Sequence, residues 1–488
     1  MISAGKQIGG LARHSSIYTV STFVQRALGL IMLPIYTDIR YIPTQSAYGD
    51  LSLAYMFISF MNVVYLYGMD AALLRYFFLG TYKRQDVYKT ALVSVLISST
   101  VLSLLLFAAA PQLGSLIFEE ALYANFIILA AIILFFDGLG NLPFLILRAE
   151  ERSLTYSAIR IGRFLVEFAL NILFVIVLRM EVLGILYANV LASFLNFVVL
   201  LPFQAKYMKG KIQKSIWKDL LYFGLPLLPN GLAYLTVEVS DKYLMRLLLD
   251  KDTLGIYAPN YKFGSILLFV VLAFRTAWQP FFLKVATQEN AKEIYSRVMT
   301  YFVLLGVMIV ILASYFVDYI LPLPLAFGKP VMGPAYQSGM IIIPVILSAY
   351  LCYGIYVNLT VGIYIRKKSQ LMILFTGLAA LVNIGSNLYL MPRYGIMGAA
   401  LATLLSYLIM AVSIYIANQR IYPVPYEYTR LAFLVSLLVI ALFILYAAQP
   451  SLIIRLIIVI VIPLLFYGSG FLRPAEIRAL KALLSRHN

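Results

Sequence analysis

The chain of 488 residues is 62% hydrophobic and only 12% charged, whereas soluble domains are roughly half apolar. This composition excludes an ordinary water-soluble fold. Lys and Arg outnumber Asp and Glu by 38 to 21, which in a soluble protein would favour nucleic-acid binding but in a membrane protein reports topology. The one cysteine, Cys352, excludes an intramolecular disulfide and a CxxC metal or redox motif.

Apolar runs of about 20 residues, separated by short polar breaks, match the length that a helix needs to cross a bilayer. The first run follows Lys6 and Arg13; it is too long for a signal peptide and lacks an AxA-like cleavage site. The sequence therefore predicts an all-α polytopic membrane protein with about fourteen transmembrane helices. In chain order they are expected at 14–38, 47–69, 87–110, 121–147, 155–178, 182–203, 219–247, 254–283, 297–321, 335–362, 369–391, 396–418, 429–448 and 451–472.

The basic residues between these spans alternate from one connection to the next. The connections on the side of the termini carry 25 Lys and Arg residues, against 7 on the other side. Because cytoplasmic loops of membrane proteins are enriched in Lys and Arg, both termini are predicted to be cytoplasmic. Topology thus accounts for most of the positive charge, and the expected partners are membrane lipids rather than nucleic acid.

An internal repeat is visible at an offset of about 206 to 211 residues. Residues 183–189, which open the sixth span, resemble residues 394–400, which open the twelfth. Tyr48-Gly49 in the second span likewise has a counterpart in residues 255–257 of the eighth. Six spans separate the copies, so the pattern predicts two six-helix lobes related by a pseudo-two-fold axis along the membrane normal. The expected division is 1–205 (helices 1–6), 206–422 (helices 7–12) and 423–488 (helices 13–14 and a cytoplasmic tail).

Six basic residues remain at membrane depth, where each one costs about 2.5–3.5 kcal/mol unless it faces water or a partner. They are Arg26, Arg160, Arg163, Lys242, Lys262 and Arg275. Two have an acid at i,i+4 spacing on the same helical face, which predicts the pairs Arg163–Glu167 and Glu238–Lys242. Asp137 and Asp241 can serve only across helices.

Surplus positive charge in a cavity favours an anionic substrate, and the planar guanidinium group suits a diphosphate. The predicted site consists of Arg26, Arg160, Arg163, Lys262 and Arg275. The alternative is that some of these residues form interhelical pairs or extend to the membrane surface. Five further charged residues are candidates for H⁺ or Na⁺ coupling or for charge pairing, namely Asp137, Glu167, Glu238, Asp241 and Lys242.

Helix breakers concentrate in the seventh span. Two prolines and two glycines lie within eight residues, and proline removes a backbone hydrogen bond and clashes with the preceding turn. The span is therefore expected to bend, with Gly224, Pro226, Pro229 and Gly231 as a candidate hinge.

Motifs for covalent chemistry are absent from the sequence. The two histidines, His14 and His487, lie near the chain ends, and no HExxH, GxSxG or P-loop pattern occurs. The sequence predicts a transporter rather than an enzyme, with no metal and no cofactor. Its energy would come from an ion or voltage gradient, or from consumption of the product on the far side.

Several segments resemble a known family. They are residues 383–403, 224–229, 241–243 followed by 255–257, and Gly29 followed by residues 34–36. In these segments the chain is similar to the polysaccharide-transporter branch of the multidrug/oligosaccharidyl-lipid/polysaccharide exporter superfamily, which includes O-antigen and capsule repeat-unit flippases. The resemblance covers the whole length as a pattern of small residues and helix breakers.

The resemblance implies two lobes that alternate between inward and outward openings around a cationic cavity in the bacterial inner membrane. The implied cargo is an undecaprenyl-diphosphate-linked oligosaccharide, such as an O-antigen, capsule or exopolysaccharide repeat unit, and the implied partner is the polysaccharide polymerase machinery. Fourteen spans are more like the lipid II flippases, so lipid II is an alternative cargo. A cation-coupled drug antiporter of the same fold is a second alternative, although it would need an acidic cavity. A polytopic polymerase or glycosyltransferase would need a large outer loop, and the outer connections are short.

Overall fold

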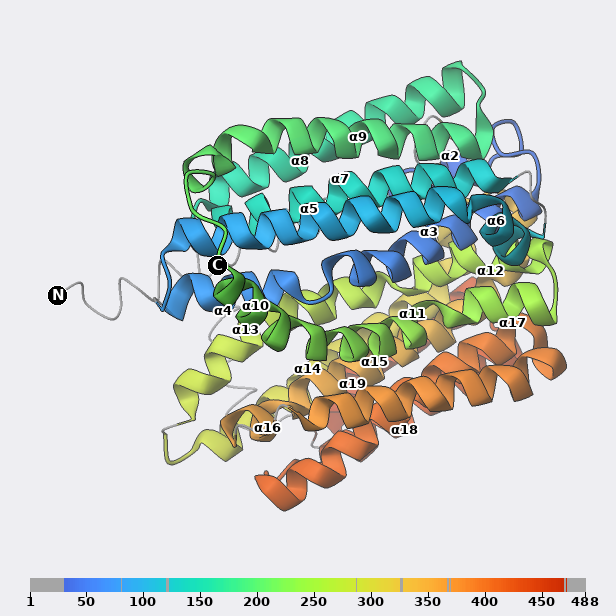
Figure 1. Cartoon of the computed structure of the whole chain (residues 1–488). Coiled ribbons are helices and arrows are strands. Elements are labelled where there is room, and N and C mark those ends of the chain that lie inside the picture. Colours follow the sequence, from blue (N-terminus) through green and yellow to red (C-terminus); the bar gives the residue numbers. More distant parts are fainter. Residues whose placement is uncertain are drawn as a thin grey trace, which may run out of the picture.

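The computed structural model describes residues 30–79, 81–119, 123–286, 288–324, 328–366, 368, 370–468 and 471. Within these residues the secondary structure is helical, and most helices run along one common direction between two ends of the molecule (Figure 1). Ten of the helices described are long and apolar enough to cross a membrane. The protein is therefore a multi-pass membrane protein, as the composition predicts.

The first half of the chain forms helices at the positions predicted for spans two to six. The second predicted span is divided at Tyr67 and Gly68, and the fifth ends in a π-helical turn at Ile172–Val177. The helices are α2 (Leu33–Tyr36), α3 (Gln45–Leu66), α4 (Met69–Leu79), α5 (Arg84–Ala108), α6 (Ala110–Phe118), α7 (Ala124–Ala149), α8 (Ser153–Asn171) and α9 (Glu181–Gln204).

The second half follows the same plan, and the seventh predicted span is broken by a short 3₁₀ turn at Leu225–Leu227. The α-helices are α10 (Lys214–Gly224), α11 (Leu228–Leu248), α12 (Lys251–Gly264), α13 (Ile266–Val285), α14 (Ala291–Ile320), α15 (Ile343–Leu359), α16 (Val361–Ile365), α17 (Leu371–Ile421), α18 (Tyr428–Ala448) and α19 (Leu452–Gly468). A 3₁₀ segment, Pro334–Ile342, leads into α15.

Helix α17 is continuous in hydrogen bonding but contains two spans. Its 51 residues include one with non-helical backbone angles, Gly395, at φ 55° and ψ −134°. A Cβ at Gly398 would overlap the backbone oxygen of Leu390, although eight residues of straight helix are about 12 Å long. The chain therefore reverses at Gly395, as predicted for a turn between 391 and 396.

Connections predicted to share one side of the membrane meet in the structure. At one end, called the basic end, Gln85 donates a hydrogen bond to the backbone oxygen of Lys206, and the ions of Glu150 and Lys206 pair. At the opposite end, Arg179 donates to the backbone oxygen of Arg40 at 3.0 Å. The alternation of charge along the sequence thus identified correctly which of these connections lie together.

Two lobes form the body of the molecule. In the first, α7 packs against α3, α5 and α9; in the second, α15 and α11 pack against α17, and α14 packs against both α15 and α18. Helices α3 and α12 join the lobes. The first lobe is the N-lobe, α2–α9, and the second is the C-lobe, α11–α17.

The contact between α3 and α12 is reciprocal at an offset of 206 residues. A Cβ at Gly49 would lie 2.5 Å from the backbone oxygen of Lys251, and a Cβ at Gly255 would overlap that of Gln45. The N-caps of the two helices, Thr44 and Asp250, occupy the same offset. The contact of Gly49 with Lys251 is thus repeated by that of Gly255 with Gln45, as expected for lobes related by a pseudo-two-fold axis.

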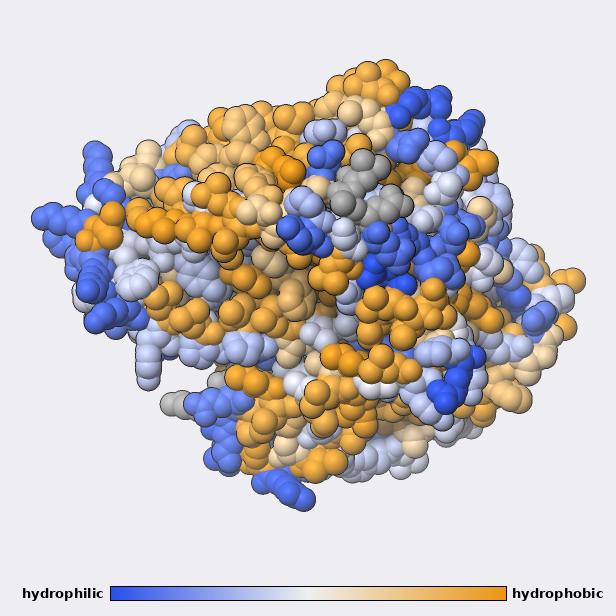
Figure 2. Space-filling view, turned by 45° about the vertical axis from the view of Figure 1, so that its right-hand side comes forward, coloured by the Kyte–Doolittle hydropathy of each residue, from blue (hydrophilic) through white to orange (hydrophobic). Residues whose placement is uncertain are grey.

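The surface agrees with a membrane environment. Hydrophobic residues cover the middle of the molecule, and hydrophilic residues gather toward its two ends (Figure 2). Large apolar side chains on several helices are more than half exposed, for example Leu105, Leu381, Phe443 and Ile453. Lipid tails are the solvent in which such exposure is favourable.

Candidate functional site

The N-lobe holds an ion pair between neighbouring helices. The Arg163 guanidinium on α8 lies 2.9 Å from one carboxylate oxygen of Asp137 on α7 and donates to the other at 3.2 Å. It also donates to the Ser193 hydroxyl on α9 at 3.0 Å. The predicted pair Arg163–Glu167 is wrong, because the packing of α7 and α9 against α8 brings Asp137 within bidentate reach.

Arg160 lies one turn before Arg163 on α8 and faces aromatic rings. Its guanidinium carbon is 4.4 Å from the ring centre of Phe144 and 5.3 Å from that of Tyr156. Cation–π contacts of this kind stabilise a charge away from water. Arg26 of the predicted site lies outside the described residues.

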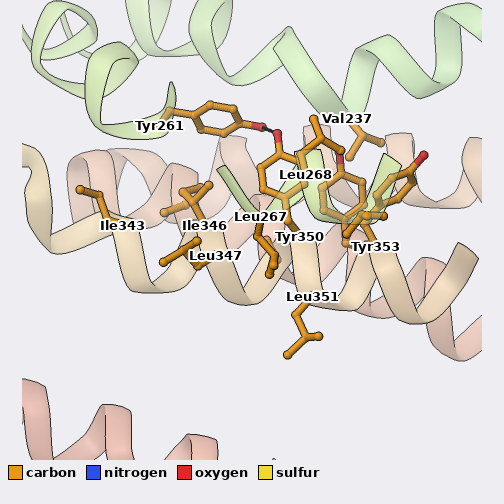
Figure 3. Packing of buried hydrophobic residues seen from close by; sticks show 14 of the residues in the cluster. Val237, Tyr261, Leu267, Leu268, Ile343, Ile346, Leu347, Tyr350, Leu351 and Tyr353 are labelled. Carbon is orange, nitrogen blue, oxygen red and sulfur yellow. Dashed lines mark hydrogen bonds between the residues drawn. The ribbon is translucent and has the colours of Figure 1, made fainter. Parts of the chain in front are cut away.

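Acids and tyrosines form a buried network in the C-lobe. The Glu238 carboxylate accepts hydrogen bonds from the hydroxyls of Tyr350 and Tyr407, each at 2.7 Å. The Tyr350 hydroxyl also lies 3.0 Å from that of Tyr261, the contact drawn as a dashed line in Figure 3. The predicted side-chain pair Glu238–Lys242 is wrong. The carboxylate is hydrogen-bonded to the two tyrosines, and Lys242 donates instead to the backbone oxygen of Glu238 at 3.2 Å.

Asp241 is fully buried beside this network. It accepts a hydrogen bond of 2.5 Å from the Tyr257 hydroxyl, and the Lys242 amine lies 3.8 Å from its other oxygen. That amine also lies 4.6 Å from the ring centre of Tyr261. The buried acid is thus held by groups on both α11 and α12.

A pocket of about 250 Å³ opens where the two lobes meet and is called the inter-lobe pocket. Lys242 and Lys262 line it from the C-lobe, and no acidic side chain lines it among the described residues. The other polar lining groups are hydroxyls, those of Tyr36, Tyr48, Ser52, Tyr55, Ser59, Tyr261 and Ser265. The pocket therefore presents positive charge from the C-lobe and hydroxyl groups from both lobes.

A larger cavity of about 550 Å³ lies within the C-lobe, toward the basic end, and is called the C-lobe pocket. Arg275 of α13 is the charged residue of its described lining, and its guanidinium lies 3.5 Å from the Tyr353 hydroxyl. Aromatic side chains form much of the wall: Tyr234, Trp278, Phe282, Tyr353, Tyr356 and Tyr364.

The structure thus distributes the predicted cations over three places rather than one. Arg160 and Arg163 lie in the N-lobe, Lys262 lines the inter-lobe pocket together with Lys242, and Arg275 lines the C-lobe pocket. The tyrosines that line these pockets and bind Glu238 and Asp241 were not predicted from the sequence. Their signal was a spacing of three or four residues along 350–356 and 257–261, a pattern that also fits belt anchors.

Four predicted hinge residues coincide with a break between α10, which packs against the N-lobe, and α11, which packs against both lobes. Helix α10 packs against α4 and α5 of the N-lobe, where Trp217 donates to the Ser94 hydroxyl at 3.0 Å. Helix α11 packs against α17 of the C-lobe. Between them lies the 3₁₀ turn, which contains Pro226; Gly224 precedes the turn, and Pro229 and Gly231 follow it in α11.

At the end opposite the basic end, three ion pairs connect the lobes. In each pair the N-lobe supplies the acid and the C-lobe side supplies the base. The amine of Lys329 lies 2.6 Å from Asp38, that of Lys251 lies 3.3 Å from Asp50, and the guanidinium of Arg246 lies 3.6 Å from Glu119. These pairs and the contact of α3 with α12 hold the lobes together at this end.

Asp38 lies in a connection outside the spans. Burial opposes ionisation of its carboxyl group, but hydrogen bonds from Arg40 and Lys329 outweigh this effect and hold its pKa well below the usual range.

Among the described residues, no group of three or more His, Cys, Asp or Glu is placed to hold a metal ion.

Comparison with solved structures shows a shared fold. A lipid II flippase, MurJ, in an inward closed conformation has a TM-score of 0.70 and 15% identity, covering 93% of this chain and 98% of that one. An inward-facing MATE family transporter of the MOP superfamily has a TM-score of 0.62 and 14% identity over 84% and 96%. The Vibrio cholerae MATE transporter VcmN in its bent form has a TM-score of 0.58 and 14% identity over 86% and 98%.

Comparison with curated proteins found no match. The pattern of the family described as "Polysaccharide biosynthesis protein" matches residues 42–327, more than half of the chain. This match agrees with the two-lobe fold, which is that of membrane transporters. The chain belongs to the polysaccharide biosynthesis protein family, and it shares its fold with MurJ and the MATE transporters.

Proposed function

We propose that the protein is a flippase that moves an undecaprenyl-diphosphate-linked oligosaccharide across the bacterial cytoplasmic membrane. The observation that carries the proposal is the lining of the inter-lobe pocket, in which two lysines and seven hydroxyl groups meet and the described residues include no acidic side chain. Such a lining attracts an oxyanion, and a diphosphate is the anion common to lipid-linked glycans. The family match supports a role in polysaccharide biosynthesis.

The proposed roles follow the three places in which the cations lie. Lys262 and Lys242 contact the diphosphate between the lobes, and Arg275 contacts an anionic part of the cargo in the C-lobe pocket. In the N-lobe, Arg160 contacts aromatic rings one turn before Arg163 on α8. Arg163 itself serves mainly as the partner of Asp137. Arg26 completes the cationic set by its place in the first predicted span.

The transport mechanism that we propose is alternating access between lobes at 1–205 and 206–422, with 423–488 as an appended helix pair and tail. The basic end faces the cytoplasm, together with both termini. The inter-lobe ion pairs then close the outer side in this conformation. Buried acids that face the lobe interior, Glu238, Asp241, Glu167 and Asp137, are the candidates for coupling to H⁺ or Na⁺. Polymerase machinery would consume the cargo outside.

The test is translocation of a fluorescent undecaprenyl-diphosphate oligosaccharide in proteoliposomes, with ion and lipid gradients supplied. We compare the parent with Lys262→Gln plus Arg275→Gln, and use Arg393→Gln, an exposed guanidinium at the turn of α17, as the matched control. Translocation by the parent and the control, but not by the double variant, supports the cargo and the site. Lipid II is assayed in parallel as the alternative cargo.

Absence of translocation of the oligosaccharide by the correctly inserted parent overturns the proposal. Movement of lipid II alone would then identify a lipid II flippase. Uptake of cationic drugs driven by an ion gradient would instead identify an antiporter. Equal translocation by parent and double variant leaves the cargo standing but removes the cationic site.

A further inference from the structure

The C-lobe pocket differs in its chemistry from the inter-lobe pocket. At about 550 Å³ it has the size of a ligand site rather than of a packing defect. Its described lining combines aromatic rings with neutral amides and hydroxyls, including Asn230, Gln279 and Thr376. The Asn230 carbonyl accepts a hydrogen bond of 2.9 Å from Thr376, which fixes the orientation of that amide.

This combination suits sugar rings. The apolar C–H face of a sugar packs on an aromatic ring, while planar amides donate to and accept from its hydroxyls. The aromatic wall is rigid: the rings of Tyr353 and Tyr356 stack with centres 6.0 Å apart, and the Trp278 indole donates to the backbone oxygen of Asn358 at 3.3 Å. A rigid wall limits the entropy that is lost on binding.

The positive charge of Arg275 in the C-lobe pocket favours a ligand that carries a negative charge. Arg275 is exposed, and no carboxylate accompanies it among the described lining residues. The neighbouring hydroxyl of Tyr353 is 3.5 Å away and leaves most of the guanidinium fork available. A ligand that presents an oxyanion beside a sugar ring would satisfy both parts of the site.

We infer that the C-lobe pocket is a saccharide subsite that binds sugar rings of the cargo against its aromatic wall, with Arg275 binding an oxyanion attached to them. The inference rests on the proposed function and deepens it, since it separates glycan recognition from the lysines between the lobes. The oxyanion has two sources, a sugar carboxylate or the sugar-linked diphosphate. Pro226 and Leu227 also line the pocket, so a bound glycan contacts the break in the seventh span.

The test uses Trp278 as a reporter. The chain has two tryptophans, and Trp217→Phe leaves Trp278 alone in the full-length protein. Its fluorescence is titrated in detergent with three soluble probes that lack a lipid: a neutral oligosaccharide, a uronic-acid oligosaccharide, and a neutral oligosaccharide 1-diphosphate. Inorganic diphosphate is a fourth titrant. Each is repeated with Arg275→Gln and with Arg393→Gln, a matched control that removes an exposed guanidinium at the turn of α17, away from the pockets.

A saturable response to an anionic oligosaccharide, weakened about tenfold or more by Arg275→Gln and unchanged by Arg393→Gln, is expected. The anionic probe that binds identifies the source of the oxyanion. No saturable response to any oligosaccharide, or one that Arg275→Gln leaves unchanged, overturns the inference. So does inorganic diphosphate binding as tightly as the oligosaccharide diphosphate. Because no translocation is measured, a negative result here leaves the flippase proposal to be decided by its own assay.

Discussion

At the scale of single residues, Arg163 and Glu238 find their side-chain partners on other helices rather than four residues away on their own. The sequence shows which oppositely charged residue lies four positions away on the same helix. The contact that forms depends on which groups of the neighbouring helices lie closer. Both carboxylate oxygens of Asp137 contact Arg163, and the carboxylate of Glu238 is hydrogen-bonded to two tyrosines rather than to Lys242. In a medium of low dielectric constant, two-pronged and doubly hydrogen-bonded contacts outweigh a single contact at i,i+4 spacing.

The pairing in the N-lobe predicts an asymmetry between two acids. Asp137→Asn leaves the buried Arg163 guanidinium without its bidentate acceptor and should destabilise the protein by about 2 kcal/mol or more. Glu167→Gln is the control, with a smaller expected effect. Thermal unfolding of the purified protein in detergent measures the difference. A larger loss of stability in Glu167→Gln would show that the i,i+4 pair operates after all.

The pair at Asp38 predicts a dependence on pH. Because its pKa in the folded protein is lowered, its contribution to stability is complete above the unfolded value of about 4 and is lost as the pH falls below it. Lys329→Met removes one cause of the lowered pKa, so the thermal midpoint of this variant should fall less between pH 5 and pH 3 than that of the parent. Parallel curves for the two proteins would contradict the assignment.

At the scale of elements, the seventh span belongs mechanically to both lobes. Helix α10 is attached to α4 and α5, whereas α11 is attached to α17, and only the 3₁₀ turn lies between them. The backbones of Gly224 and Gly68 touch, so the breaks of the seventh and second spans meet at one point. Helix α11 also packs against α3 of the N-lobe, and the break is a place where the seventh span can bend when one lobe rotates against the other.

The break predicts a role for its prolines in switching. Pro226→Ala with Pro229→Ala restores two backbone donors and favours a continuous helix, which should slow transport about threefold or more while leaving expression intact. Pro143→Ala, inside α7, is the matched control. Translocation rates in proteoliposomes measure the effect. If the control slows transport as much as the double variant, the break is a static kink.

At the scale of the whole molecule, the sequence was sufficient to predict the positions of the helices and insufficient to predict which side chains line the pockets. Span positions follow from apolar runs and breakers, and the repeat from matching residues such as Gly49 and Gly255, so the predicted spans lie within a few residues of the helices described. The C-lobe pocket depends instead on how five helices pack, α11, α13, α15, α16 and α17, which no local pattern encodes. Arg275 was therefore found by its charge, whereas the tyrosines around it were not assigned.

At this scale the ion pairs also bear on the end opposite the basic end, which is the outer side in the proposed topology. The acid of each pair there comes from one lobe and the base from the other. Lys251→Glu places two acids together at Asp50 and should raise the population open to the outside about tenfold, since breaking a buried pair costs more than 1.4 kcal/mol. Reversing the pair with Asp50→Lys should recover closure, because attraction returns with the opposite geometry. A cysteine at Ser265 in the inter-lobe pocket, with Cys352→Ser, reports the opening through labelling by an impermeant maleimide from outside. If labelling is unchanged by Lys251→Glu, the lobes are held closed by the packing of α3 against α12, and the ion pairs contribute specificity of docking rather than closure.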